Sequence, residues 1–249
     1  MSIEVISFNI RYADDNGGNT IDERAPRVKK VIEEHCPDII GFQECTPKWL
    51  SYIEKYYGDE YEIFNKYRHA EEESAPLLFR KSRFECVDKG YFWLSDTPNV
   101  ESKGWDELYD CYRICMWAIL EDKKTGGRYQ VINTHFGFGD RGQIKSVGLM
   151  REQARKYPYP VIMMGDFNMK PEFKAYAEMT KDFSDVNALT ENDMRITYHG
   201  YNKDEGSHID YFFINDGFEA LEYQMLDKLI EGKFPSDHYG IRCVVKAKC

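Results

Sequence analysis

The sequence predicts an α/β protein in which helices cover β-sheets. Six short apolar runs have the composition of largely buried strands, and helical patterns lie between some of them. The runs are SIEVISFNI (2–10), PDIIGFQE (37–44), YQVINTHF (129–136), YPVIMMGDFN (159–168), HIDYFFIN (208–215) and YGIRCVVKA (239–247). Mixed strands and helices favour this architecture. Because no repeat or Pro/Gly/Ser-rich linker divides the 249 residues, we expect one domain spanning 1–249.

A helix is predicted between the first two strands. Pro26 is placed in its first turn, where the missing N–H costs nothing. Apolar and boundary residues then recur at helical spacing, and Cys36-Pro37 ends the pattern. The residues of this stripe are Val28, Val31, Ile32 and His35.

A second helix is predicted after Glu44. Thr46 can cap its first turn, since a threonine hydroxyl accepts hydrogen bonds from free backbone N–H groups. Pro47 suits the first helical position, and Gly58 suits the end of the helix. We therefore expect a helix of about three turns there.

Composition and charge exclude several functional classes. Hydrophobic residues make up 42% of the chain, which is enough for a substantial core. No apolar run is long enough to span a membrane, and the N-terminus does not resemble a signal peptide. The seven scattered cysteines form no C-x-x-C pair, so we expect free thiols and a cytoplasmic location. The net charge of −10 disfavours tracking along nucleic acid, although it does not exclude it.

Polar side chains gather at the ends of the predicted strands. One Asp or Asn there is usually a turn former, and for Asp166 alone that would be the better explanation. Asp210 is harder to explain, because an unpaired carboxylate in an apolar strand is costly. Six strand ends or approaches carry such groups, which predicts a polar site at a sheet edge. They are Asn9, Gln43-Glu44, Asn133 with His135, Asp166 with Asn168, Asp210, and Ser236-Asp237-His238.

The residue types indicate metal-assisted hydrolysis. Carboxylates and amides provide the hard oxygen ligands that suit Mg²⁺ or Mn²⁺. Histidines beside acids can donate protons or stabilise developing negative charge. The sequence has no G-x-S-x-G elbow, Walker motif or G-x-G-x-x-G motif. Water attack on a phosphate ester is the chemistry that remains.

The order SFNI, IGFQE, NTH, GDFN, IDYFF, SDH resembles the endonuclease/exonuclease/phosphatase superfamily, which includes exonuclease III-like and DNase I-like proteins. The resemblance covers essentially the whole chain. Further stretches, FWLSDTP, SKGWD, YRICMWA and TYHGY, are similar to a bacterial branch of metal-dependent phosphohydrolases. The resemblance to the superfamily implies a four-layer α/β sandwich of two mixed β-sheets packed face to face and flanked by helices. It also implies in-line attack of an activated water on phosphorus.

The resemblance further implies roles for individual residues. Glu44 would be the main metal ligand, with Asn9 beside it and Asp237 as a second metal-site carboxylate. Asp166 would align or deprotonate the water, and Asn168 would position the water or the phosphate.

Other residues would contact the phosphate or support those that do. His238, oriented by Asp210, would stabilise the transition state, and His135 would contact the phosphate from the other side. By the same resemblance, Glu73 would pair with His135.

Further residues are predicted to form the substrate pocket. Arg113 lies among apolar and aromatic residues, and a phosphate site needs a bidentate cation. We expect Arg113 and Asn133 to bind substrate and Trp93 and Trp105 to wall the pocket.

The sequence leaves three functions open. A hydrolase of small or short phosphodiesters or phosphomonoesters fits the charge best. A nuclease acting on DNA or RNA remains the alternative, and an inactive binding module on the same scaffold is a more remote one. The complete set of expected catalytic residues argues against the inactive module.

Overall fold

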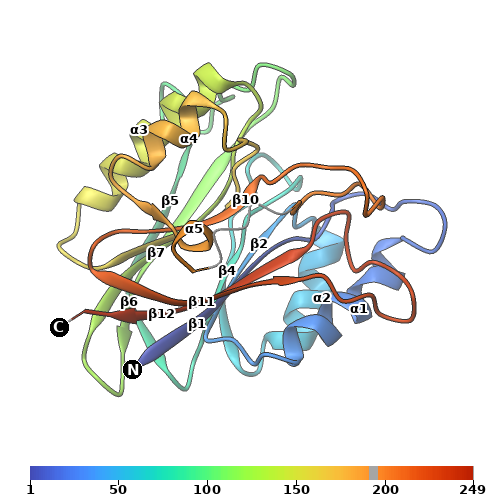
Figure 1. Ribbon diagram of the computed structural model, residues 1–249, viewed down its shortest axis with the longest axis horizontal. Helices are drawn as coiled ribbons and strands as arrows, with labels where there is room; N and C mark the ends of the chain where they lie inside the picture. The colour runs from blue at the N-terminus through green and yellow to red at the C-terminus, as the bar shows by residue number, and fades with distance from the viewer. Residues whose placement is uncertain (191–195, 249) are drawn as a thin grey trace.

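Two β-sheets pack face to face in the computed structural model of this protein, which describes residues 1–190 and 196–248 (Figure 1). In this part of the chain each sheet has six strands. The first sheet has the order β11-β12-β1-β2-β4-β3 and the second β5-β6-β7-β8-β10-β9. The strands of the first sheet are β11 (Phe218–Leu226), β12 (Gly240–Ala247), β1 (Ser2–Asn9), β2 (Ile39–Gln43), β4 (Leu77–Arg80) and β3 (Tyr61–Phe64). Those of the second sheet are β5 (Phe84–Trp93), β6 (Ile114–Asp122), β7 (Arg128–His135), β8 (Val161–Asp166), β10 (Asp210–Ile214) and β9 (Ser184–Asp185).

Helices cover the outer face of each sheet (Figure 1). Those packed on the first sheet are α1 (Ile21–Glu33) and α2 (Pro47–Tyr57). Those packed on the second are α3 (Asp140–Arg155) and α4 (Lys174–Met179), and a short α5 (Val186–Thr190) follows β9. The expected four-layer sandwich is confirmed. Among the described residues, no helix has both the length and the apolar character needed to cross a membrane.

The core between the sheets explains why the six runs became strands. Alternate residues of β1 and β12, such as Val5 and Ile241, face residues of the second sheet, such as Val131 and Phe212, in one buried cluster. The other face of β1, with Ile6 and Phe8, packs under α1 and α2. Both faces of the central strands are therefore buried, which explains runs that are apolar at nearly every position.

The start of α1 differs from the prediction. The helix begins at Ile21, so Pro26 lies in its second turn and not in its first. Thr20 and Glu23 form a reciprocal capping box that fixes the earlier start. The α2 prediction is confirmed, with Thr46 as N-cap, Pro47 as the first residue and Gly58 as C-cap.

Candidate active site

Strand ends from both sheets meet at one edge of the sandwich. In the first sheet β1 and β2 are parallel, and Asn9 lies beside Gln43. In the second sheet Asp166 lies between His135 on β7 and Asp210 on β10. The predicted polar residues are thus brought together because their strands end at matching positions of the two sheets.

Asn9 links the two sheets. Its Nδ2 donates hydrogen bonds to Glu44 Oε1 at 3.0 Å and to Asp166 Oδ2 at 2.9 Å. Its Oδ1 accepts a hydrogen bond from the backbone N–H of Arg11 at 3.0 Å, which orients the amide. Asn9 therefore presents nitrogen, not oxygen, to the carboxylates and holds them close together.

Glu44 is positioned by unusual backbone geometry. It follows directly after β2 with a φ of 61°, in a region that a glutamate rarely adopts. Its Oε2 accepts a hydrogen bond from the backbone N–H of Tyr12 at 2.8 Å. Such strain is concentrated at functional sites, where surrounding contacts maintain it.

Asp166 is held by its own turn. Its Oδ1 accepts a hydrogen bond from the backbone N–H of Asn168 at 2.9 Å. Gly165 has a φ of 147°, and a Cβ there would lie 2.0 Å from the carbonyl oxygen of Thr134. The glycine of GDFN is therefore needed for β8 to approach β7 beside the site. Burial and the nearby Asp210 carboxylate raise the pKa of Asp166 to about 7.

His238 and Asp210 form a buried pair, with Nδ1 and Oδ2 2.9 Å apart. The other ring nitrogen, Nε2, lies 3.7 Å from Asp166 Oδ2. Burial alone would lower the pKa of His238, but the surrounding carboxylates, chiefly Asp210, raise it to about 10. His238 is therefore a cation at neutral pH.

His135 has the opposite character. Burial, together with the positive charges of Arg113 and Arg68, lowers its pKa well below the usual value, so the ring is neutral. Its Nε2 lies 3.0 Å from Asn168 Nδ2, which can donate to it. Asn168 also donates to the backbone oxygen of Phe136 at 2.9 Å. This arrangement leaves Nδ1 of the neutral ring to carry the proton.

A cleft of about 920 Å³ opens onto this group of residues. Glu44, His135, Asp166, Asn168, Asp237 and His238 line it, together with Glu73 and Arg113. The sequence did not predict the aromatic part of the lining, because most of these residues lie in loops or just outside the quoted motifs, and Tyr198, although within TYHGY, carries no signal of its own. They are Tyr12, Tyr109, Phe138, Phe173 and Tyr198. Trp93 and Trp105, which were expected there, are not among the lining residues.

The prediction that Asn133 binds substrate is not supported, because Asn133 is fully buried between the sheets. Its Nδ2 donates to the backbone oxygens of Phe42, Ala75 and Pro76, and its Oδ1 accepts from Gln43 Nε2 at 2.7 Å. Asn133 lies on β7 two residues before His135 and therefore on the same face of the strand. It lies too deep between the sheets to reach the cleft.

Two more expected contacts take another form. Among the described residues, the Glu73 carboxylate pairs with Arg68 at 3.1 Å, whereas the hydrogen-bond partner of His135 is Asn168. Asp237 Oδ2 lies 3.6 Å from Arg11 Nε. Both carboxylates line the cleft, and Glu73 is bound to Arg68 where a pairing with His135 was expected.

Arg113 is buried on the cleft wall. Its Nη2 lies 3.2 Å from Asp106 Oδ2. Its Nε is buried and has no hydrogen-bond partner among the described residues. The side chain of Arg113 therefore lies on the cleft wall with Asp106 as its carboxylate partner.

A family model for the endonuclease/exonuclease/phosphatase family matches residues 6–238. The chain belongs to this family. A family protein from Bacteroides vulgatus superposes with a TM-score of 0.91 at 26% identity, and 100% of each chain is covered. A mannosyl-6-phosphatase from Bacteroides thetaiotaomicron gives 0.86 at 27% identity, with 98% of this chain and 99% of that chain covered.

A curated relative is similar over a shorter region. An uncharacterized protein of Acanthamoeba polyphaga mimivirus is 29% identical over 163 residues, which is 59% of each protein. The chain thus spans well under two thirds of that relative's length. Family membership places this chain among hydrolases of phosphate ester bonds.

The donor set of the family site fits a hard divalent cation. Oxygens of Glu44 and Asp166 and a ring nitrogen of His238 lie within 4.8 Å of one another. Because His238 is protonated and paired with Asp210, it is a poor ligand, and the two carboxylates are the better ones. Asp237 is not in this group. Asn9 could ligate through oxygen only after its amide turned over, since its nitrogen now faces the carboxylates.

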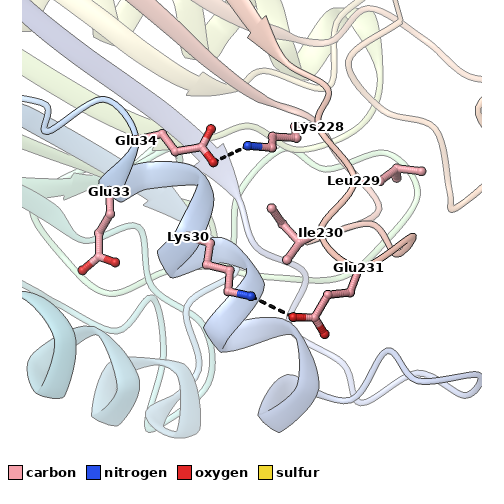
Figure 2. A pocket seen from close by; sticks show the side chains of 7 residues that line it. All are labelled: Lys30, Glu33, Glu34, Lys228, Leu229, Ile230 and Glu231. Carbon is pink, nitrogen blue, oxygen red and sulfur yellow. Dashed lines mark hydrogen bonds and ion pairs between the residues drawn. The ribbon is translucent and has the colours of Figure 1, made fainter.

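A second hollow lies on the surface between α1 and the loop before β12, and it shares no lining residue with the cleft (Figure 2). Its charged side chains pair with each other, Lys30 with Glu231 at 2.8 Å and Lys228 with Glu34. These exposed ion pairs tie the loop to the helix. They leave no set of convergent groups for chemistry.

Proposed function

We propose that this protein is a divalent-metal-dependent hydrolase that cleaves the phosphate ester of a small substrate with an activated water. One observation carries the proposal. A carboxylate of raised pKa, Asp166, and a cationic imidazole, His238, lie 3.7 Å apart on the wall of one cleft. Groups whose pKa values are strongly shifted by burial and by neighbouring charges cluster at functional sites.

The carboxylates of Glu44 and Asp166 would hold Mg²⁺ or Mn²⁺, which supplies positive charge to the phosphate oxygens. Asp166 accepts a proton from the attacking water. His238, kept protonated by Asp210, donates a hydrogen bond to a phosphate oxygen as negative charge builds there. The ester oxygen leaves and is protonated from solvent.

The remaining residues position these groups. Asn9 fixes the separation of Glu44 and Asp166. Asn168 donates to Nε2 of the neutral His135, so Nδ1–H is the donor that His135 would offer to the phosphate. Arg113 supplies a guanidinium donor to a phosphate oxygen.

The cleft favours a small substrate. Its rim is aromatic, with Tyr109 packed edge-on against Phe138 at 5.5 Å, and the chain as a whole is acidic. Aromatic rings give a ring-bearing leaving group a surface on which to stack. The similar mannosyl-6-phosphatase supports sugar phosphates as a substrate class to test early.

The test is a hydrolysis panel with Mg²⁺, with Mn²⁺ and with EDTA. It compares p-nitrophenyl phosphate, bis-p-nitrophenyl phosphate, sugar phosphates, short oligonucleotides and plasmid DNA. Metal-dependent release of phosphate from small esters is the expected result. Turnover confined to the nucleic acids would favour the nuclease alternative. No turnover on any member would favour a binding module.

The control for that panel is Asp166→Asn, which keeps the shape of the side chain. Losing a water-activating carboxylate should lower kcat by about a thousandfold, whereas the folded state should persist. A variant with full turnover and a normal circular dichroism spectrum would remove Asp166 from the proposed role.

A further inference from the structure

Arg11 lines the catalytic cleft, and its guanidinium lies close to two carboxylates. Its Nε lies 3.1 Å from Asp15 Oδ2 and 3.6 Å from Asp237 Oδ2. A second hydrogen bond joins Arg11 Nη2 to Asp15 Oδ1 at 3.3 Å, so Asp15 holds the guanidinium at two points. The positive charge of Arg11 is therefore fixed on the Asp237 side of the cleft.

The backbone of Arg11 is anchored as firmly as its side chain. Its φ is 61°, in the left-handed region that an arginine rarely adopts. Its N–H donates to Asn9 Oδ1 at 3.0 Å, and its carbonyl oxygen accepts from Trp49 Nε1 at 2.8 Å and from Arg24 Nη2 at 3.0 Å. Trp49 and Arg24 are both fully buried. The position of Arg11 beside Asp237 is thus set by the core of the fold.

Both carboxylate oxygens of Asp237 already have neighbours. Oδ1 accepts a hydrogen bond from Ser236 Oγ at 3.2 Å, and Oδ2 faces Arg11. Within residues 1–190 and 196–248, the atoms that converge for a metal ion come from Glu44, Asp166 and His238 and not from Asp237. A divalent ion placed at Asp237 would also lie beside the Arg11 charge, which would repel it.

The charge of Arg11 acts on the metal side of the cleft as well. Although burial lowers the pKa of Arg11, its hydrogen bond to Asp15 and the charges of Asp237 and Glu44 raise it above the ordinary value on balance. Arg11 is therefore a permanent cation that lies near both Asp237 and the expected metal ligand Glu44.

We propose that Arg11 takes the place of a second metal ion beside Asp237, so that the protein binds one divalent ion, at Glu44 and Asp166. The inference rests on the proposed function, which requires an ion at those two carboxylates. Because Arg11 lines the same cleft, its guanidinium supplies to the substrate phosphate the positive charge that a second ion would supply. Asp237 then serves to position Arg11 and not to bind metal.

The experiment counts bound Mn²⁺ without substrate, by the electron paramagnetic resonance signal of free Mn²⁺ and by calorimetry. We expect one ion in the wild-type protein and one in Arg11→Lys, which keeps the charge. Arg11→Gln should bind a second ion, because Asp15 and Asp237 lose the cation that they share. This second ion should bind about tenfold or more weakly than the first and should be lost again when Asp237→Asn is added.

The matched control is Arg80→Gln, which changes the net charge equally. Arg80 also pairs with a carboxylate, that of Glu60, but it does not line the cleft. Arg80→Gln should bind one ion. Two ions in the wild-type protein, or one in a folded Arg11→Gln, would overturn the inference and leave the proposed hydrolase intact. No bound ion in the wild-type protein would count against the proposed function and the inference together.

Asp237→Asn decides the question even if Arg11→Gln does not fold. Since Asp237 is not a metal ligand in this proposal, Asp237→Asn should still bind one Mn²⁺, with a Kd within about threefold of the wild-type value. A ligand carboxylate would cost more affinity than that, so a Kd raised by about tenfold or more would overturn the inference.

Discussion

The charge of His238 depends on Asp210, which is its closest partner at 2.9 Å. Because burial favours the neutral ring and Asp210 is the largest influence that opposes it, Asp210→Asn should lower the pKa of His238 from about 10. NMR titration of the imidazole in EDTA would measure this shift. An unchanged pKa would show that Asp166 and Asp237 keep His238 charged by themselves.

The Asp210–His238 pair also makes the stability of the folded protein depend on pH. Because the folded-state pKa of His238 is raised above the ordinary value, its contribution is complete below about pH 6.5 and is lost as pH rises through about 10. Chemical denaturation at pH 8, 9 and 10 should therefore show a loss of stability that is smaller in Asp210→Asn. Parallel losses in both proteins would contradict this assignment.

Glu44 has the clearest metal-ligand position among the predicted residues. Replacing it with glutamine removes one ligand charge but preserves the hydrogen bond from Tyr12 N–H. Glu44→Gln should raise the Mg²⁺ concentration for half-maximal activity by about tenfold or more. Glu107→Gln, also on the cleft wall, is the control and should leave the requirement unchanged. Equal Mg²⁺ dependence in the wild type and Glu44→Gln would move the main ligand elsewhere.

For individual residues, the order of the motifs predicted which side chains would lie at the site. It did not predict every hydrogen-bond or ion-pair partner. The Asp210–His238 contact was implied by the family resemblance, and the two groups lie 2.9 Å apart. The Arg68–Glu73 contact was not implied, because it depends on the path of a loop that periodicity does not describe. Asn133 was misplaced because alternation gives the face of a strand but not the depth of a residue in the sandwich.

Among the elements, β2 and β7 are joined across the sandwich by Asn133. Gly41 makes this possible, since a Cβ there would lie 2.7 Å from Asn133 Oδ1. Asn133→Ala should lower the free energy of unfolding by about 3 kcal/mol, because buried carbonyl groups lose their donor and a cavity remains. The kcat of the folded protein should stay within about threefold of wild type.

Urea denaturation measures that loss, and Asn99→Ala at an exposed loop position is the control, with an expected change under about 0.5 kcal/mol. A stable Asn133→Ala protein with a greatly raised KM would restore the original substrate-binding prediction for Asn133.

Central strands and capped helices were predictable because burial on both faces and capping chemistry leave local signals. The edge strands β5 and β11 carry exposed charged residues between their buried ones and gave no comparable apolar run. The start of α1 is set by the capping box at Thr20 and Glu23, a stronger local signal than Pro26, which the helix accommodates in its second turn.

For the whole molecule, the net charge of −10 disfavours long polyanions. Hydrolysis of a small phosphate ester should be inhibited less than about twofold by excess duplex DNA at ~0.05 M salt. Strong competition that weakens as salt is added would instead indicate a nucleic-acid track on the surface.

Two further expectations, that residues 1–249 form one domain and that the protein is cytoplasmic, remain proposals.

The bridge that Asn9 forms between Glu44 and Asp166 has a mechanical consequence. Each sheet contributes one of the two carboxylates, so a cation bound by both would act as a clamp across the sandwich. Ligand binding to the folded state alone raises its stability. Mg²⁺ should accordingly raise Tm. Catalytic activity should be lost at the same point as the packing of the two sheets against each other. A measurement of enzymatic activity would then report directly on whether the two sheets are packed together.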